Sequence, residues 1–438
     1  MNDMTLLTGY GRADITPDYP VHMQGGNWRG RVSTGILDRL YVTCIAFTTG
    51  EQTVLLYTTD LKLVTKNFSE VTRDEISAAT GVPREQIYLS GTHTHSSVAI
   101  RYPWEGVEEY RAFFNAAAVK AAQEALSDRS PSEIFSGTTE TEGLIFVRHY
   151  LMKDGTVCGS NFGSTASGYV GHIKPADQQM QLVQLRRENK KDILMVGFPC
   201  HGTFKEGGTE LSADYIGPAR AYAEANCDCH FALFQGSCGD QTPGSRIKGL
   251  AIKDYAEHGS KVAQYALDAI PTLTPCPAGE IRVSSMHFTA PTNKKKLEKL
   301  PEALEVVGLV EKHGATSEEV KEAVKKYHFH SRHEANWVRI RAAAGDEKSM
   351  EIGVFSVGEL AFVLAPYEMF GDQGRYIKTN APHKTAFIVG CMDGGYNYLP
   401  TKEAFDYDCY ESQCSFFERG TAERLAETYV SMLADLKK

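Results

Sequence analysis

The chain has 438 residues, of which 42% are hydrophobic, so it can bury a large core as one large unit or as two closely merged lobes. Its formal charge is −9, and no run of Lys and Arg is interleaved with aromatic residues, which argues against nucleic acid as a partner. No apolar window reaches the length of a membrane span, and the first residues lack the basic and apolar regions of a signal peptide. We therefore expect a cytoplasmic protein without a membrane span.

Strand-like and helix-like segments alternate in the N-terminal third. The runs 41–47 and 53–59 are rich in β-branched and aromatic residues and are separated by a short turn, which predicts a hairpin. Residues 69–80 and 107–126 have apolar positions at helical spacing, and the first of these segments stops at Gly81. Together these patterns predict an α/β protein in which helices flank the strands.

Histidines follow two apolar runs. His93 and His95 lie in the segment 89–97, and residues i and i+2 of a strand project from one face, so both imidazoles can converge on a metal ion or a polarised substrate. The alternative is that one histidine completes a strand end and the other is solvated. His201 follows the apolar run 193–198, at the kind of strand end where α/β proteins gather their chemistry. A third histidine near the pair completes the minimum for a catalytic zinc site.

The C-terminal half contains a charged segment and a second hairpin. Residues 294–327 carry most of the Lys and Glu density, with opposite charges at i and i+4, which predicts a solvated helical excursion. It either covers the pocket as a lid or packs outside it. Residues 350–364 predict a hairpin turning at Gly358, which delivers Glu368 just past a buried strand.

Six motifs, in the same order along the chain, resemble those of the catalytic domain of neutral/alkaline, non-lysosomal ceramidases. The resemblance implies an α/β fold of mixed β-sheets flanked by helices over residues 1–438, as a single catalytic domain with a charged helical excursion at about 294–330. The chain departs from the larger enzymes in lacking a signal peptide and in ending with a helix-like segment at 421–436, so we expect a compact, cytoplasmic, bacterial-type relative without their C-terminal β-sandwich domain. The motifs are Gly9–Pro17, Leu37–Tyr41, Gly91–Ser96, Cys200–Thr203, Leu211–Tyr215 and Gly236–Pro243.

In that family a zinc ion, held by two histidines, a glutamate and a tyrosine, activates water against the amide of an N-acyl sphingoid base. Carried over by motif, the resemblance implies that Zn²⁺ is bound by His93, His201, Glu368 and Tyr398. A zinc ion with two neutral imidazoles and one carboxylate keeps a net positive charge, which lowers the pKa of bound water and polarises a carbonyl.

The resemblance assigns three further residues to catalysis. Tyr410 is expected to face the oxyanion, and Arg148 matches the active-site arginine, so both can donate to the negative charge that develops on the carbonyl oxygen. His95 is expected to face the substrate and to move protons to the leaving amine, because an imidazole titrates near neutral pH.

Two other groups of residues allow more than one interpretation. Asp38, Asp60 and Asp214 either accept hydrogen bonds from the ring nitrogens that face away from the metal, or end strands and cap helices. Three histidines within residues 328–333 offer a second metal cluster, although solvated loop histidines are the simpler interpretation.

Two departures from the family bear on the substrate. Thr242 stands where the family has a serine, and together with the missing signal peptide this makes a soluble amide or ester at least as plausible as membrane ceramide. We expect a zinc-dependent hydrolase that cleaves the amide bond of a small or lipid-like acyl substrate. The alternatives are a metal-independent cysteine hydrolase that uses Cys238 or Cys200, and a non-catalytic metal- or ligand-binding relative. The oligomeric state is not indicated.

Overall fold

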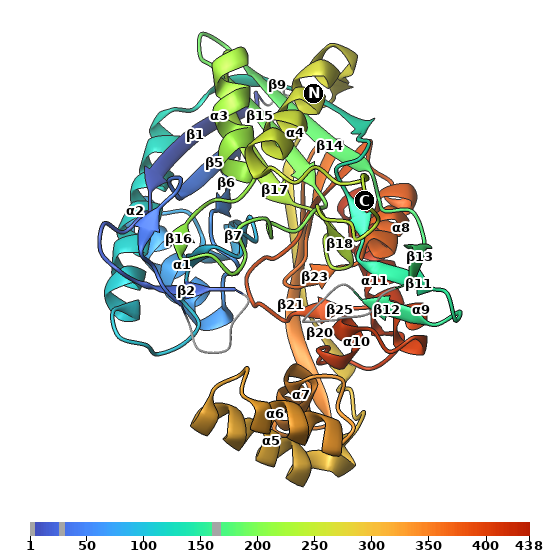
Figure 1. The fold of residues 1–438 in the computed structure, drawn as a ribbon. Coiled ribbons are helices and arrows are strands. Elements are labelled where there is room, and N and C mark those ends of the chain that lie inside the picture. Colours follow the sequence, from blue (N-terminus) through green and yellow to red (C-terminus); the bar gives the residue numbers. More distant parts are fainter. Residues whose placement is uncertain (1–4, 26–30, 160–167) are drawn as a thin grey trace.

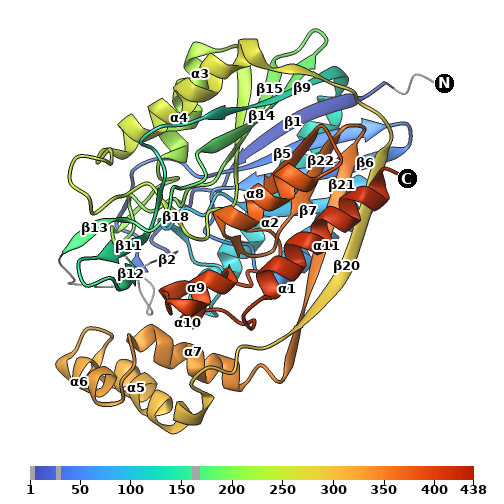
Figure 2. The same ribbon diagram turned by 90° about the vertical axis from the view of Figure 1, so that its right-hand side faces the viewer.

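The computed structural model describes residues 5–25, 31–159 and 168–438. Two β-sheets pack face to face at the centre of the protein, and helices cover both outer faces (Figures 1 and 2). Within the described residues the larger sheet has nine strands in the order β17-β15-β14-β9-β1-β5-β6-β7, with β19 beside β9. The strands are β1 (Leu7–Asp14), β5 (Tyr41–Thr49), β6 (Gln52–Thr59), β7 (Ile87–Gly91), β9 (Ser130–Glu140), β14 (Gln179–Arg187), β15 (Asp192–Phe198), β17 (Cys229–Gln235) and β19 (Thr274–Cys276).

The smaller sheet packs on the larger one through aromatic side chains. In β21, Phe355 faces the larger sheet, where its ring centroid lies 6.2 Å from that of Phe47, while Val354 belongs to the core on the opposite face. Successive strand residues point to opposite faces, so one strand contributes to two cores. The sheet order is β20-β21-β22-β24, with β20 (Ile281–Pro291), β21 (Glu347–Val357), β22 (Leu360–Leu364) and β24 (Thr385–Val389).

Helices complete the outer layers and confirm the predicted mixed α/β fold. The hairpin predicted at 41–59 is formed by β5 and β6, and the hairpin predicted at 350–364 turns at Gly358, whose φ of +62° suits glycine. No helix among the described residues is long and apolar enough to cross a membrane. The larger sheet is covered by α1 (Lys66–Thr80), α2 (Val107–Ser127), α3 (Ile216–Asn226) and α4 (Tyr255–Ala269), and the smaller sheet by α8 (Gly371–Asn380) and α11 (Thr421–Leu436).

The charged excursion forms a helical unit at the far ends of β20 and β21 (Figures 1 and 2). Its helices are α5 (Leu300–His313), α6 (Glu318–Lys326) and α7 (Arg332–Ala342), which enclose a small core of their own. The unit continues past the predicted end near residue 330, because the Ser331 side chain accepts a hydrogen bond from the Glu334 backbone and starts α7. This Ser-x-x-Glu spacing is a helix-start signal that the charge pattern alone does not reveal.

The loops around the ends of the two sheets contain short paired strands. Most of them pair with a segment distant in the sequence, so they tie loops from different parts of the chain together. They are β2 (His22–Gln24), β3 (Arg31–Val32), β4 (Gly35–Ile36), β8 (Ser97–Val98), β10 (Phe146–Val147), β11 (His149–Met152), β12 (Val157–Gly159), β13 (Tyr169–His172), β16 (Glu210–Leu211), β18 (Gln241–Thr242), β23 (Glu368–Met369) and β25 (Tyr398–Leu399).

Helix α2 lies directly on strand β1, and glycine makes this close approach possible. A Cβ atom at Gly11 would overlap the carbonyl oxygen of Ala121. We therefore expect Gly11→Ala to lower the free energy of unfolding by about 2–3 kcal/mol, measured by urea denaturation. The matched control is Gly171→Ala in β13, where an added Cβ meets nothing within 4 Å. Equal stability of the two variants would contradict this packing.

Candidate metal centre

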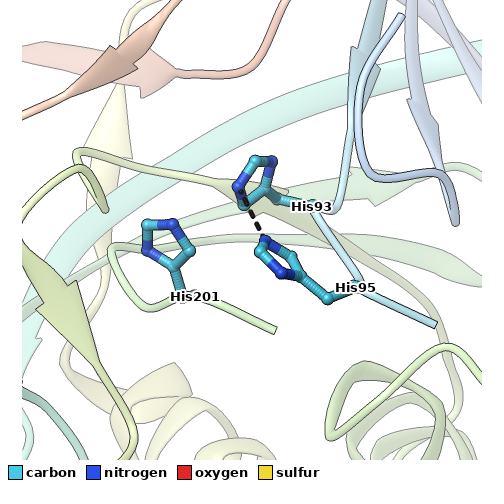
Figure 3. A group of neighbouring side chains, drawn as sticks. All are labelled: His93, His95 and His201. Carbon is cyan, nitrogen blue, oxygen red and sulfur yellow. Dashed lines mark hydrogen bonds between the residues drawn. The ribbon is translucent and has the colours of Figure 1, made fainter. Parts of the chain in front are cut away.

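His93 and His95 lie just beyond the end of β7, which stops at Gly91. His93 has a φ of +63°, so the expectation that the two histidines project from one face of an extended strand is wrong. The chain turns instead, and backbone hydrogen bonds from His93 N to Leu61 O (3.1 Å) and from His95 N to Gly202 O (2.9 Å) hold the turn. The rings nevertheless converge as expected, with their Nε2 atoms 3.3 Å apart (Figure 3). A left-handed non-glycine residue stores strain, which is typical of functional sites.

His201 joins this pair from the end of β15, where the sequence predicts it. Its ring centroid lies 4.8 Å from that of His93 and 5.7 Å from that of His95 (Figure 3). One ring nitrogen from each histidine lies within 4.8 Å of the other two, and all three side chains are buried. Strand ends far apart in the sequence thus bring three imidazoles to one point.

Glu368 adds a carboxylate to the histidine group from the start of β23. Its Oε2 atom lies 3.0 Å from His201 Nε2 and 3.3 Å from His93 Nε2. Two ligand atoms on a tetrahedral zinc ion, each about 2.0–2.1 Å from the metal, are about 3.3 Å apart. The spacing of His93, His201 and Glu368 therefore suits a shared divalent ion.

The hydrogen bonds behind the two imidazoles determine which ring atoms face the carboxylate. His93 Nδ1 lies 2.6 Å from Lys62 O, and His201 Nδ1 lies 2.8 Å from Cys238 O and 2.9 Å from Gln241 O. Carbonyl oxygens only accept hydrogen bonds, so each Nδ1 carries the proton and each Nε2 of a neutral ring presents a lone pair to Glu368. When both rings are neutral, two lone pairs and a carboxylate face one another in a buried site, which requires positive charge from a proton or a metal ion.

The pKa values of Glu368 and His201 are shifted in directions that favour positive charge between these groups. Burial acts to raise the pKa of Glu368, but the His93 and His201 imidazoles hold it well below its usual range. Burial acts to lower the pKa of His201, yet Cys238 and Glu368 raise it to about 9. Positive charge is thus favoured where the nitrogens meet the carboxylate, whether a proton or a metal ion supplies it. The donor set fits a divalent metal.

Two tyrosines and an arginine border this group. Tyr398 in β25 lies directly opposite Glu368 in the β23–β25 ladder, and its ring centroid is 6.4 Å from that of His201. The Tyr410 ring centroid is 5.7 Å from that of Tyr398, and the Arg148 guanidinium carbon lies 5.1 Å from the Tyr398 ring centroid. The structure therefore gathers all seven residues that the sequence assigns to the site.

Arg148 is held in place by Glu411, whose role the sequence does not reveal. Its Nε lies 2.7 Å from Glu411 Oε1, and its Nη2 donates to Gly239 O at 2.6 Å. Glu411 Oε2 also lies 2.7 Å from His149 Nε2. Burial acts to raise the pKa of Glu411, but Arg148 and His149 lower that pKa to about 2. The buried carboxylate neutralises Arg148 and orients its guanidinium.

His95 contacts a second glutamate that the sequence does not single out. His95 Nδ1 lies 2.8 Å from Glu206 Oε1, in an irregular segment that has no periodic signal. Burial, together with the positive charge of Lys62, lowers the pKa of His95 to about 3 despite Glu206. The expectation that His95 titrates near neutral pH is therefore wrong for the metal-free site, because a buried imidazolium is costly. His95 is a neutral base there.

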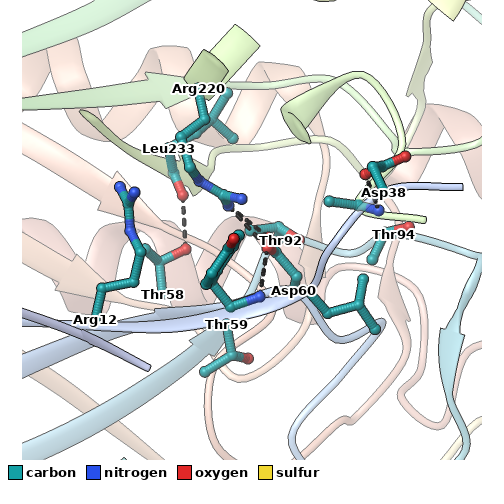
Figure 4. A network of polar contacts seen from close by, with 12 residues as sticks. Arg12, Asp38, Thr58, Thr59, Asp60, Thr92, Thr94, Arg220 and Leu233 are labelled. Carbon is teal, nitrogen blue, oxygen red and sulfur yellow. Dashed lines mark hydrogen bonds and ion pairs between the residues drawn. The ribbon is translucent and has the colours of Figure 1, made fainter. Parts of the chain in front are cut away.

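The predicted aspartate acceptors do not hold the imidazoles. Asp60 pairs with Arg220 Nη2 at 2.8 Å and accepts a hydrogen bond from Tyr41 N at 2.9 Å, in the network of Figure 4. Thr92 Oγ1, next to His93, lies 3.4 Å from Asp60 Oδ1. The positions behind His93 and His201 are already filled by backbone carbonyls, so Asp60 supports the histidine loop instead of a ring.

Asp38 and Asp214 are likewise structural. Asp38 accepts a 2.6 Å hydrogen bond from Ser212 Oγ, and Ser212 O accepts one of 2.7 Å from Thr94 Oγ1. Asp214 accepts hydrogen bonds from the backbone nitrogens of Lys205 and Tyr215, both at 2.8 Å, at the start of α3. The interpretation as loop and helix-end carboxylates is the one that the contacts support.

The three histidines of residues 328–333 do not come together, but His330 forms a group with Glu334 and Asp408 whose ligand atoms lie within 4.8 Å of one another, a spacing that allows a metal ion. His330 is exposed and lies 3.0 Å from Asp408 Oδ2. His333 is not a solvated loop residue, because it lies in α7 with its ring edge-on to Tyr410, at a centroid distance of 6.3 Å. The helical unit thus approaches the site at Tyr410.

A cavity of about 650 Å³ opens beside the metal centre. His95, Arg148 and Tyr398 line it, together with Glu206 and a loop that begins at Thr242. Its lining does not include His93, His201 or Glu368 among the described residues. A substrate in the cavity would therefore meet His95, Arg148 and Tyr398 directly.

Two solved structures resemble the whole protein. The neutral ceramidase from Pseudomonas aeruginosa aligns with 100% of this chain and 75% of its own chain, at 17% sequence identity and a TM-score of 0.74. A ceramidase complexed with C2 aligns with 99% of this chain and 76% of its own, with the same identity and TM-score. No family model and no curated protein matches the chain. The resemblance drawn from the sequence motifs is thereby confirmed at the level of the fold, and the protein has a neutral ceramidase-like α/β fold along its whole length.

Proposed function

We propose that the protein is a zinc-dependent hydrolase that cleaves the amide bond of a small or lipid-like acyl substrate. In this proposal zinc is bound by His93, His201, Glu368 and Tyr398. The observation that carries the proposal is the buried approach of the His201 and His93 Nε2 atoms to the Glu368 carboxylate, at 3.0 and 3.3 Å. The similarity to two ceramidase structures supports it.

The residues around the centre suit the cleavage of an acyl bond. A bound zinc ion supplies Lewis acidity and lowers the pKa of a coordinated water. Burial keeps the pKa of Tyr410 well above its ordinary value, so its hydroxyl stays protonated and can donate a hydrogen bond. Arg148 keeps its charge and its orientation through Glu411. Both side chains can therefore stabilise negative charge on the carbonyl oxygen of the substrate.

His95 is proposed as the residue that moves protons. Its Nδ1 is hydrogen-bonded to Glu206, and its Nε2 is directed toward the centre. A neutral imidazole in this position accepts a proton and passes it to the leaving amine, while Glu206 stabilises the imidazolium that forms. His95 also lines the cavity, where the substrate would lie.

Removal of a proposed ligand should remove the metal. We expect purified wild-type protein to contain about one zinc per chain, and His201→Ala or Glu368→Gln to lose both the metal and hydrolysis of an acyl amide panel. Metal content is measured by plasma mass spectrometry beside the kinetics. The matched control is His258→Ala, which removes a buried histidine that lies against Phe204, outside the metal centre. Variants of His201 that keep both zinc and activity would contradict the proposal.

His95→Gln should show whether His95 transfers protons or binds the metal. We expect zinc to remain bound, because His93, His201 and Glu368 are intact, while kcat falls by about 10²–10⁴-fold through loss of proton transfer. Metal content and kcat are measured on the same preparation. Loss of zinc from His95→Gln would show instead that His95 is a ligand, which its 3.3 Å approach to His93 permits.

The cysteine and non-catalytic alternatives make different predictions. Burial raises the pKa of Cys200 well above its usual value, whereas Cys391 and the His201 imidazole hold the pKa of Cys238 well below its usual value although that thiol is buried. Neither Cys200 nor Cys238 is part of the described cavity lining. We expect chelation to abolish the activity and added zinc to restore it. Activity that resists chelation but is lost on thiol alkylation would favour a cysteine nucleophile. A zinc-loaded protein that hydrolyses no acyl amide would favour a binding function.

A further inference from the structure

Positive charge gathers on one wall of the cavity. Arg246, Lys248 and Lys253 all line it from the segment that links β18 to α4. The described lining contains one carboxylate, Glu206, and that group is engaged by His95 at 2.8 Å. The three cations of this segment therefore outnumber the one carboxylate of the described lining.

The two lysines are available to a ligand. Both are exposed, and within the described ranges neither ammonium group makes a hydrogen bond or an ion pair. Arg246 is more firmly held, because its guanidinium carbon lies 5.4 Å from the Tyr169 ring centroid and its backbone nitrogen donates to Tyr150 Oη at 2.9 Å. An excess of cations over carboxylates on a concave wall raises the local concentration of anions.

We propose that the substrate carries an anionic oxygen group, a carboxylate or a phosphate, which binds Lys248 and Lys253 while the scissile amide lies beside His95. This inference rests on the proposed hydrolase function and specifies its substrate class. Arg246, on the same wall, adds to the positive field that attracts the group.

The remaining lining suits a short acyl chain. Phe204, Ile247 and Ile252 contribute apolar surface to the same cavity. A volume of about 650 Å³ lies in the range that holds a single small molecule. The substrate is therefore a short acyl amide with one charged end.

The test compares matched amides that differ in charge. The substrates are N-hexanoylglycine, its neutral carboxamide N-hexanoylglycinamide, and the phosphate ester of N-hexanoylethanolamine. We expect wild-type protein to prefer an anionic amide over the neutral one, and the Lys248→Met/Lys253→Met variant to lower the ratio of their kcat/KM values about tenfold, mainly through KM. Added salt should lower the same ratio in the wild type. The preferred anion identifies the group as a carboxylate or a phosphate.

The control is Lys261→Met, which removes an exposed lysine of α4 outside the cavity lining and should leave the ratio unchanged. An unchanged ratio in the double variant would overturn the anion site while leaving the hydrolase proposal intact. If no amide is hydrolysed, the hydrolase proposal fails, and calorimetric binding of N-hexanoylglycine decides the anion site. Tighter binding to the wild type than to the double variant supports the site, and equal or absent binding overturns it.

Discussion

The arrangement of the site depends on one electrostatic constraint, the burial of the Glu368 carboxylate against the Nε2 atoms of His93 and His201. Backbone carbonyls accept hydrogen bonds from the opposite ring nitrogens, so both Nε2 atoms stay directed at the carboxylate, where a proton or a metal ion supplies the positive charge. The two imidazoles and the carboxylate are therefore oriented toward one point before any metal arrives. Such preorganisation is expected of a metal centre, because the ligands need not rearrange when the ion binds.

The scaffold brings these donors together from the ends of strands in both sheets. His93 follows β7, His201 follows β15, and Glu368 follows β22 of the smaller sheet. The aromatic core between the sheets therefore fixes the distance between the histidines and the glutamate. Around this centre two catalytic candidates have a carboxylate partner, which is Glu206 for His95 and the buried Glu411 for Arg148. These carboxylates restrict the side chains that line the cavity, so that a substrate would meet oriented groups.

Much of this arrangement follows from the sequence, and the rest does not for identifiable reasons. Composition predicts the β5–β6 hairpin, whose strands are rich in β-branched and aromatic residues and are buried on both faces. Periodicity predicts helices α1 and α2, which bury one face each. The motifs identify the seven site residues, because these residues lie in short segments that follow one another along the chain in the same order as in the family they resemble. The turn at His93, whose φ is +63°, is missed because backbone hydrogen bonds to Leu61 and Gly202 hold it. Both partners are distant in the sequence, so the local pattern does not reveal them. Glu206 and Glu411 are missed because a carboxylate in an irregular segment carries no local signal of its partner.

The central claim is that His93, His201 and Glu368 share one zinc ion. X-ray absorption at the zinc edge of the purified full chain tests it most directly. We expect a single zinc site with four or five nitrogen and oxygen neighbours and the outer-shell scattering of imidazole rings, at about 2.0–2.1 Å for the nearest atoms. A protein that binds no zinc, or a spectrum dominated by sulfur neighbours, would contradict this centre.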